Sequence, residues 1–214
     1  MARFRDFQRL SKVNNTTLIG ASGEMSDYQY IQQLLEHWVI EERCLDDGHS
    51  IWPSNVFEYL STVMYNRRNK FNPLWNSIVV GGLDASGQTC VVRPPDAAKL
   101  VKRLLCSRGS KSLPGLIFLS PDRFLGCVDL RGGIYKATTI ATGFGAHLAQ
   151  PLLRSRVEGR EATLSEEEAR VIMEDAMRVL SYRDCRTLTR IQIATVTAAV
   201  CTSPIVRRSG CAPL

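Results

Sequence analysis

The chain has 214 residues, of which 44% are hydrophobic, and a formal net charge of +6. This length suffices for one sizeable domain, and no apolar run of about 20 residues or amino-terminal signal pattern is present, so we interpret the protein as soluble and unsecreted. The seven cysteines include no CxxC pair, and the three histidines are not clustered. This pattern predicts free thiols in a reducing compartment, with no disulfide frame, metal site or cofactor.

The positive charge is concentrated in one segment. Residues 88–123 hold seven basic side chains against two acidic ones, and the tail from Thr197 adds Arg207 and Arg208. Basic surfaces that bind nucleic acid usually interleave aromatic side chains, whereas Phe118 is the single aromatic residue of this segment. We therefore keep nucleic-acid or membrane-surface binding only as an alternative function.

The first half of the chain predicts two strands and two helices. Residues 1–16 suit a strand or extended piece that ends in a turn at Asn14-Asn15. Residues 17–19 predict a buried strand, and the small residues 20–23 predict a sharp turn. A long amphipathic helix should follow, because its apolar residues recur at helical spacing: Ile31, Leu34, Leu35, Trp38 and Val39. A second helix should begin with Pro53 in its first turn.

Residues 77–81 predict a strand whose partner comes only at residues 124–129. The intervening segment, 88–122, is too long for a hairpin loop in a compact domain. Residues 97–105 could form a basic amphipathic helix, but prolines and glycines interrupt the remainder. We predict that 88–122 is a solvated insertion, disordered or only loosely helical.

The second half predicts a hairpin, two more helices and a strand. A turn at 129–133 leads to Ile134, and Gly143-Phe144-Gly145 precedes a helix interrupted by a proline. This turn lacks the further glycines and Lys-Ser/Thr of phosphate loops, so phosphate binding is not expected. Residues 165–168 read as a capping box before a fourth helix. Residues 190–196 predict the last strand, and an unpacked tail is expected after residue 200.

Several segments carry a resemblance to a known family. TLIGASGEMSDYQYIQQLL, NKFNPLWNSIVVGG, FLGCVDLRGGIYKA and GFGAHLAQPLL are similar to β subunits of the eukaryotic 20S proteasome, in particular to a noncatalytic member of the β ring. The resemblance covers residues 2–87 and 123–196. It implies an α+β fold, a four-layer αββα sandwich of the N-terminal-nucleophile hydrolase type. It also implies one domain over 1–214, with 88–122 as an atypical insertion and 197–214 as an atypical tail.

Departures from the family are expected at three junctions. The resemblance implies that the first strands of the fold are missing before Met1 and that the insertion interrupts a tight hairpin. It also implies that residues after Thr197 replace a C-terminal arm that reaches neighbouring subunits. Such junctions are typical of an incomplete gene model, a retained intron or a splice variant.

The resemblance implies a structural subunit without catalytic residues. Active β subunits use an N-terminal threonine as nucleophile, whereas this chain begins Met1-Ala2. GFGA at 143–146 stands where active subunits have GSGS, and Asp184 matches a family aspartate that we interpret as a structural hydrogen-bond partner. The implied partners are other proteasome α and β subunits, with no nucleic acid or membrane. The implied role is ubiquitin-dependent protein degradation in cytoplasm and nucleus.

A stand-alone hydrolase is the other alternative, either of the N-terminal-nucleophile or of the thiol type. A thiol enzyme would need one of three cysteines as nucleophile and one of three histidines as base: Cys44, Cys127 or Cys185 with His37, His49 or His147. Cysteines are commonly buried, and histidines on helices commonly pack, so we favour the structural subunit.

Overall fold

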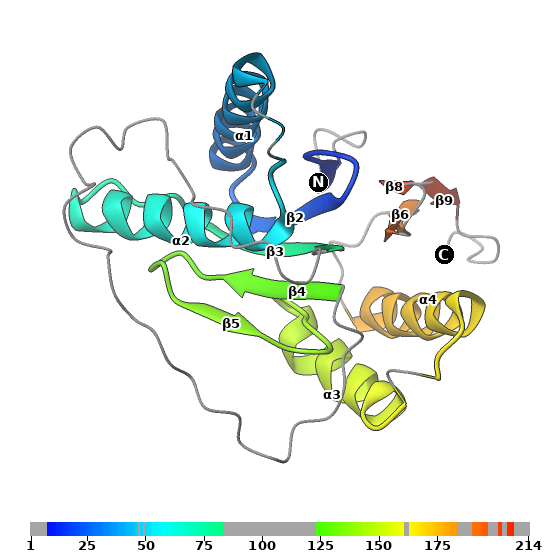
Figure 1. Cartoon of the computed structure of the whole chain (residues 1–214). Helices are drawn as coiled ribbons and strands as arrows, with labels where there is room; N and C mark the ends of the chain where they lie inside the picture. Colours follow the sequence, from blue (N-terminus) through cyan, green and yellow to red (C-terminus); the bar gives the residue numbers. More distant parts are fainter. Residues whose placement is uncertain are drawn as a thin grey trace, which may run out of the picture.

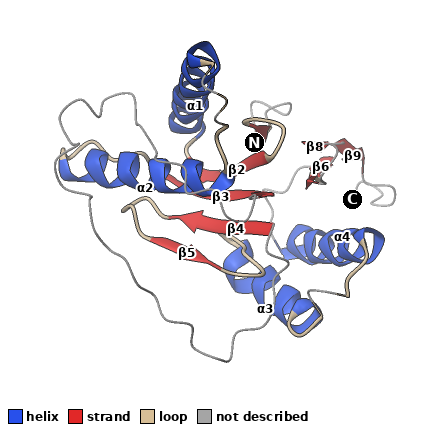
Figure 2. Cartoon of the chain, in the orientation of Figure 1, coloured by secondary structure: helices blue, strands red, loops and turns tan. Residues whose placement is uncertain are grey.

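The described part of the chain forms an antiparallel sheet with helices on both sides, an α+β arrangement (Figures 1 and 2). A computed structural model describes residues 8–46, 48, 50–83, 123–160, 163–183, 190–196, 201–202 and 205–207. The predicted insertion at 88–122 and most of the tail at 197–214 therefore lie outside the described residues.

Five strands make the main sheet, in the order β1-β2-β3-β4-β5 with every neighbouring pair antiparallel. They are β1 (Leu10–Lys12), β2 (Thr17–Gly23), β3 (Asn76–Leu83), β4 (Arg123–Val128) and β5 (Ile134–Lys136). The predicted pairing of residues 77–81 with 124–129 is confirmed, since Val80 faces Gly126 in the β3–β4 register. The predicted hairpin at 129–133 is also confirmed by the β4–β5 pairing.

The sharp turn predicted at residues 20–23 is wrong, because β2 continues in extended conformation through these small residues to Gly23. Neighbouring groups approach Gly20 and Gly23 so closely that a larger side chain would not fit at either position. A Cβ on Gly20 would lie 2.8 Å from the Leu10 side chain, and one on Gly23 would lie 2.1 Å from the Trp75 carbonyl oxygen. Gly82 is similarly crowded by the Thr16 carbonyl oxygen and by Pro53. Strand β3 extends past the predicted end at residue 81 to Leu83, where it still pairs with β4.

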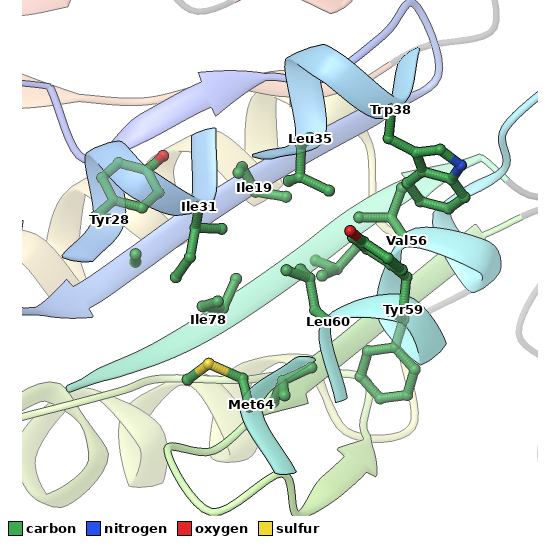
Figure 3. Packing of buried hydrophobic residues seen from close by; sticks show 14 of the residues in the cluster. Ile19, Tyr28, Ile31, Leu35, Trp38, Val56, Tyr59, Leu60, Met64 and Ile78 are labelled. Atoms are coloured by element: carbon green, nitrogen blue, oxygen red, sulfur yellow. The ribbon is translucent and has the colours of Figure 1, made fainter. Parts of the chain in front are cut away.

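Helices α1 (Met25–Leu45) and α2 (Pro53–Asn69) confirm the first two predicted helices, and they cover one face of the sheet (Figure 1). Figure 3 shows their side chains meeting those of β2 and β3. The labelled members of this core come from both helices and both strands: Ile19, Tyr28, Ile31, Leu35, Trp38, Val56, Tyr59, Leu60, Met64 and Ile78. Every second residue of the strands points into the core, which is the alternation expected of a sheet covered on this face.

Helices α3 (Gly145–Val157) and α4 (Glu166–Arg183) pack against each other on the other side of the sheet (Figure 1). The predicted capping box is confirmed: Glu168 N donates to Ser165 Oγ, and Ser165 N donates to a Glu168 carboxylate oxygen, both at 3.2 Å. Pro151 lies inside α3, as the sequence indicated.

Four short strands end the described chain: β6 (Arg190–Gln192), β7 (Thr195–Val196), β8 (Cys201–Thr202) and β9 (Ile205–Arg207). The single strand predicted at 190–196 is divided in two. The prediction of an unpacked tail is wrong for β8 and β9, because β8 pairs with β7 and β9 pairs with β6. The β-branched residues of the segment 205–206 favour such pairing, which a local reading of the turn residues missed.

Candidate functional site

The glycine turn before α3 lies at the position where the resemblance would place catalytic groups. Gly143 has a left-handed φ of 61°, and the turn closes with a hydrogen bond from Ala146 N to Gly143 O at 3.2 Å. A Cβ on Gly143 would lie 3.9 Å from the Ser22 side chain, so the turn faces the end of β2. Phe144 is exposed, and Gly145 is buried beside Leu180. The residues of this turn carry no hydroxyl, carboxyl or amine side chain.

The hydroxyl of Ser22, which lies near this turn, is used within the sheet. Its Oγ donates to the Ser77 carbonyl oxygen at 3.4 Å. A nucleophilic serine needs a base within hydrogen-bond reach. No histidine or carboxylate is bonded to Ser22 among the described residues. The predicted structural aspartate, Asp184, lies outside them.

Cys127 is the buried thiol of β4, and its partner is a tyrosine. It faces Tyr135 across the β4–β5 pair. Burial raises the pKa of Cys127, while the hydrogen bond to Tyr135 lowers it less. Burial, with the Cys127 hydrogen bond as a smaller cause, raises the pKa of Tyr135 to about 12. Both groups are therefore protonated at neutral pH, the opposite of what a reactive thiolate requires.

The remaining thiol candidates are not brought together where the structure describes them. Cys44 is exposed near the end of α1, and His37 is exposed on the same helix. Seven helical residues correspond to roughly 10 Å along the axis, which is beyond hydrogen-bond reach. His147 is exposed on α3, and its side chain makes no described contact to a cysteine. Cys185 and His49 lie outside the described residues.

Other chemistries find little support within the described residues. They contain no cluster of three or more His, Cys, Asp and Glu side chains able to hold a metal ion. None of their helices has the length and apolarity needed to cross a membrane.

Exposed apolar side chains are the feature that the sequence reasoning missed. Phe71 is 97% exposed and Trp75 is 62% exposed in the loop between α2 and β3. Tyr182 of α4 is 70% exposed. The segment NKFNPLWN served only as a family motif, although an aromatic residue inside a Pro- and Asn-containing loop is a signal for such exposure.

Comparison with known proteins places these features in a family. Residues 94–196 match the family model described as "Proteasome subunit". Proteasome subunit beta type-4 of Xenopus laevis is 44% identical over 197 residues, which covers 92% of this chain and 66% of the relative. The Dictyostelium discoideum protein of the same name is 37% identical, over 91% of this chain and 61% of the relative.

A third relative is covered over more of its own length. The probable proteasome subunit beta type-7 of Encephalitozoon cuniculi is 34% identical, over 92% of this chain and 74% of the relative. The chain spans only 61% to 66% of the Xenopus, Schizosaccharomyces pombe, Dictyostelium and Arabidopsis relatives. The resemblance drawn from the sequence motifs is confirmed, including the similarity to beta type-4 subunits. Similarity that reaches across nearly the whole chain shows that it belongs to the proteasome subunit family.

Proposed function

We propose that this chain is a noncatalytic structural β subunit of the 20S proteasome core. It helps to close the β ring and shape the chamber in which proteins are degraded in a ubiquitin-dependent way, in cytoplasm and nucleus. The observation that carries the proposal is the 44% identity over 92% of the chain to a subunit named proteasome subunit beta type-4.

Exposed apolar side chains support assembly with other proteasome α and β subunits. Helix α4 leaves four of them at its surface: Val171 (57%), Met173 (43%), Val179 (38%) and Tyr182 (70%). Soluble monomers rarely expose a contiguous apolar patch, and Val171, Val179 and Tyr182 recur at the spacing of one helix face, as expected of a surface that a subunit interface buries. We assign these residues to contacts with neighbouring subunits.

The proposal includes the four-layer αββα sandwich. The face of the main sheet opposite α1 and α2 carries apolar residues that are buried or half-buried, such as Leu18 and Leu125. Strand β7 lies against β3, and β6 is tied to β1 through Gln192. We assign the short pairs β6–β9 and β7–β8 to the second sheet.

The side chains at the glycine turn support a noncatalytic role. Phe144 and Ala146 stand where the active subunits that the family resemblance describes have serines. The buried thiol of Cys127 is held protonated, so it does not replace an N-terminal threonine as nucleophile.

Purification of proteasome particles from cells that express the tagged full chain tests this function. We expect quantitative mass spectrometry to find the chain in 20S particles together with the other β subunits. A threonine-reactive inhibitor should label other β subunits in these particles and leave this chain unlabelled. Absence from particles would contradict the subunit role, and labelling of this chain would contradict the noncatalytic role.

A further inference from the structure

The loop between α2 and β3, residues 70–75, is held rigidly at both ends. Phe71 N and Asn72 N donate to the carbonyl oxygens of Arg68 and Arg67, each at 3.1 Å. At its other end, Trp75 N donates to a carboxylate oxygen of Asp27 at 2.9 Å. The Trp75 carbonyl accepts from Glu24 N at 3.0 Å, and Leu74 is buried in the main core. The loop is therefore part of the folded frame of β2, α1 and α2.

This rigid loop presents aromatic side chains to solvent. Phe71 is 97% exposed although its backbone has a φ of 55°, a left-handed conformation that non-glycine residues rarely adopt. The Trp75 side chain is 62% exposed on the same loop. The fold gains little from either ring, and a loop whose backbone is already held loses less entropy when a partner covers it.

A cation with unused hydrogen-bond donors lies at the same corner. The Arg67 guanidinium stacks on the Tyr30 ring of α1, with Cζ 4.8 Å from the ring centroid. Its Nε is buried without a hydrogen-bond partner, and no carboxylate of the described residues forms an ion pair with it. Such a stacked, planar guanidinium is suited to bind a carboxylate through two parallel hydrogen bonds.

We propose that these residues, named the 70–75 corner (Tyr30, Arg67, Phe71 and Trp75), dock a segment of a neighbouring proteasome subunit. That segment carries a carboxylate, which binds Arg67, beside an apolar side chain, which packs on Phe71 and Trp75. The combination of Arg with Tyr, Trp and Phe is typical of the centre of protein interfaces.

The inference rests on the proposed function, and photo-crosslinking within particles tests both separately. Cells express the tagged full chain with p-benzoylphenylalanine in place of Phe71, and 20S particles are purified and irradiated. We expect one discrete adduct with a proteasome subunit, whose crosslinked peptide has an Asp or Glu beside an apolar residue. In an Arg67→Glu background the adduct yield should fall about tenfold, because the charge reversal repels the carboxylate. An Arg67→Lys background should retain more of it.

The control position is Glu58, which is exposed on the same helix roughly 14 Å from Arg67 along the axis. The photoreactive residue at Glu58 should not give this adduct. The inference alone is overturned if tagged chains are present in particles but position 71 gives no adduct, or if Arg67→Glu leaves the adduct unchanged. An adduct between two copies of this chain, or with nucleic acid or lipid, also overturns it. Absence of the tagged chain with native Phe71 from particles overturns the proposed function, and the inference with it.

Discussion

The helices on the two sides of the sheet are held by very different cores. Between α1, α2 and the sheet, large side chains such as Tyr28, Ile31 and Leu60 are completely buried. Between α3 and α4 the buried side chains among the described residues are fewer and smaller, with partly buried side chains such as Leu152 and Leu180 around them: Ala149, Leu153, Ile172 and Ala176. Apolar burial is the main source of folding free energy. The main core therefore contributes more folding free energy to the described chain than the α3–α4 cluster does, and we expect the α3–α4 layer to gain stability from the neighbouring subunits of the proposed particle.

The same substitution on each side measures this difference most strongly. Ile31→Ala in α1 should lower the free energy of unfolding by about 4 kcal/mol, because its rigid surroundings leave a cavity. Ile172→Ala in α4 should cost about 2 kcal/mol, since the small cluster around it can relax. Urea unfolding with unchanged m values gives both numbers. Equal losses would mean that the α3–α4 layer is as firmly packed as the main core.

Adding a methyl group to the main core tests how tightly this core is packed, because a rigid core does not accommodate extra volume. A Cβ on Gly126 of β4 would lie 2.4 Å from the Phe57 ring, so Gly126→Ala should cost about 1–3 kcal/mol. Gly133 has open space around its Cβ position, and Gly133→Ala should change stability by less than about 0.5 kcal/mol. Calorimetric melting temperatures of the two variants test whether Gly126→Ala destabilises the chain more than Gly133→Ala does. A tolerated Gly126→Ala would show that the Phe57 ring can move.

The stability of the β1 edge of the main sheet should depend on the side-chain amide of Gln192. Gln192 of β6 accepts from Leu10 N and donates to Leu10 O, each at 3.3 Å, and so satisfies the edge of β1. Gln192→Leu should cost about 1–2 kcal/mol through the two lost hydrogen bonds. It should also speed hydrogen exchange at the Leu10 amide, as NMR can record. Gln33→Leu, on the exposed surface of α1, is the matched control and should change neither quantity.

The smallest effect is expected at the surface of the α3–α4 layer. Hydrogen bonding to Arg156 lowers the pKa of Asp175 from 3.8, and Arg178 acts in the same direction. Because the folded-state pKa is depressed, the stabilisation is present above 3.8 and is lost as pH falls through the lowered value. Asp175→Asn should therefore destabilise slightly at neutral pH and not at acidic pH or high salt.

Urea midpoints of the wild type and Asp175→Asn across this pH range test that sign. Glu36→Gln, which removes a carboxylate with no ion pair in the described part of the chain, should show no such crossover. A difference that persists at acidic pH would contradict the assignment to the ion pair.

Sequence reasoning predicted the helices because their signals are local. The apolar period around Ile31 and the reciprocal cap of Ser165 and Glu168 act within a few residues. Sequence reasoning failed where residues distant in the sequence determine the backbone conformation. Gly20 is extended because it pairs with Leu10 of β1 and Val79 of β3, and β9 forms because β6 supplies its partner. In both cases the strand partners lie outside the local sequence window from which the conformation was predicted.

The candidate site was predictable only in part. The glycine turn at 143–146 was found by its composition, and its facing of Ser22 follows from the folded chain. The protonated state of Cys127 depends on burial in the sheet, which a cysteine count does not reveal. Phe71 was read as part of a family motif, because its exposure and left-handed backbone come from the hydrogen bonds that fix the loop.

Hydrogen exchange with mass spectrometry, on the free chain and on the chain in 20S particles, tests the central claim most directly. In the free chain, amides of α1, α2 and β2–β4 should exchange slowest and those of α3 and α4 much faster. In particles, the amides of α4 should become strongly protected while those of α1 and α2 change little, because neighbouring subunits should bury the apolar side chains that α4 exposes in the free chain. A free chain whose α4 is already as protected as α1, with no further change in particles, would contradict the account.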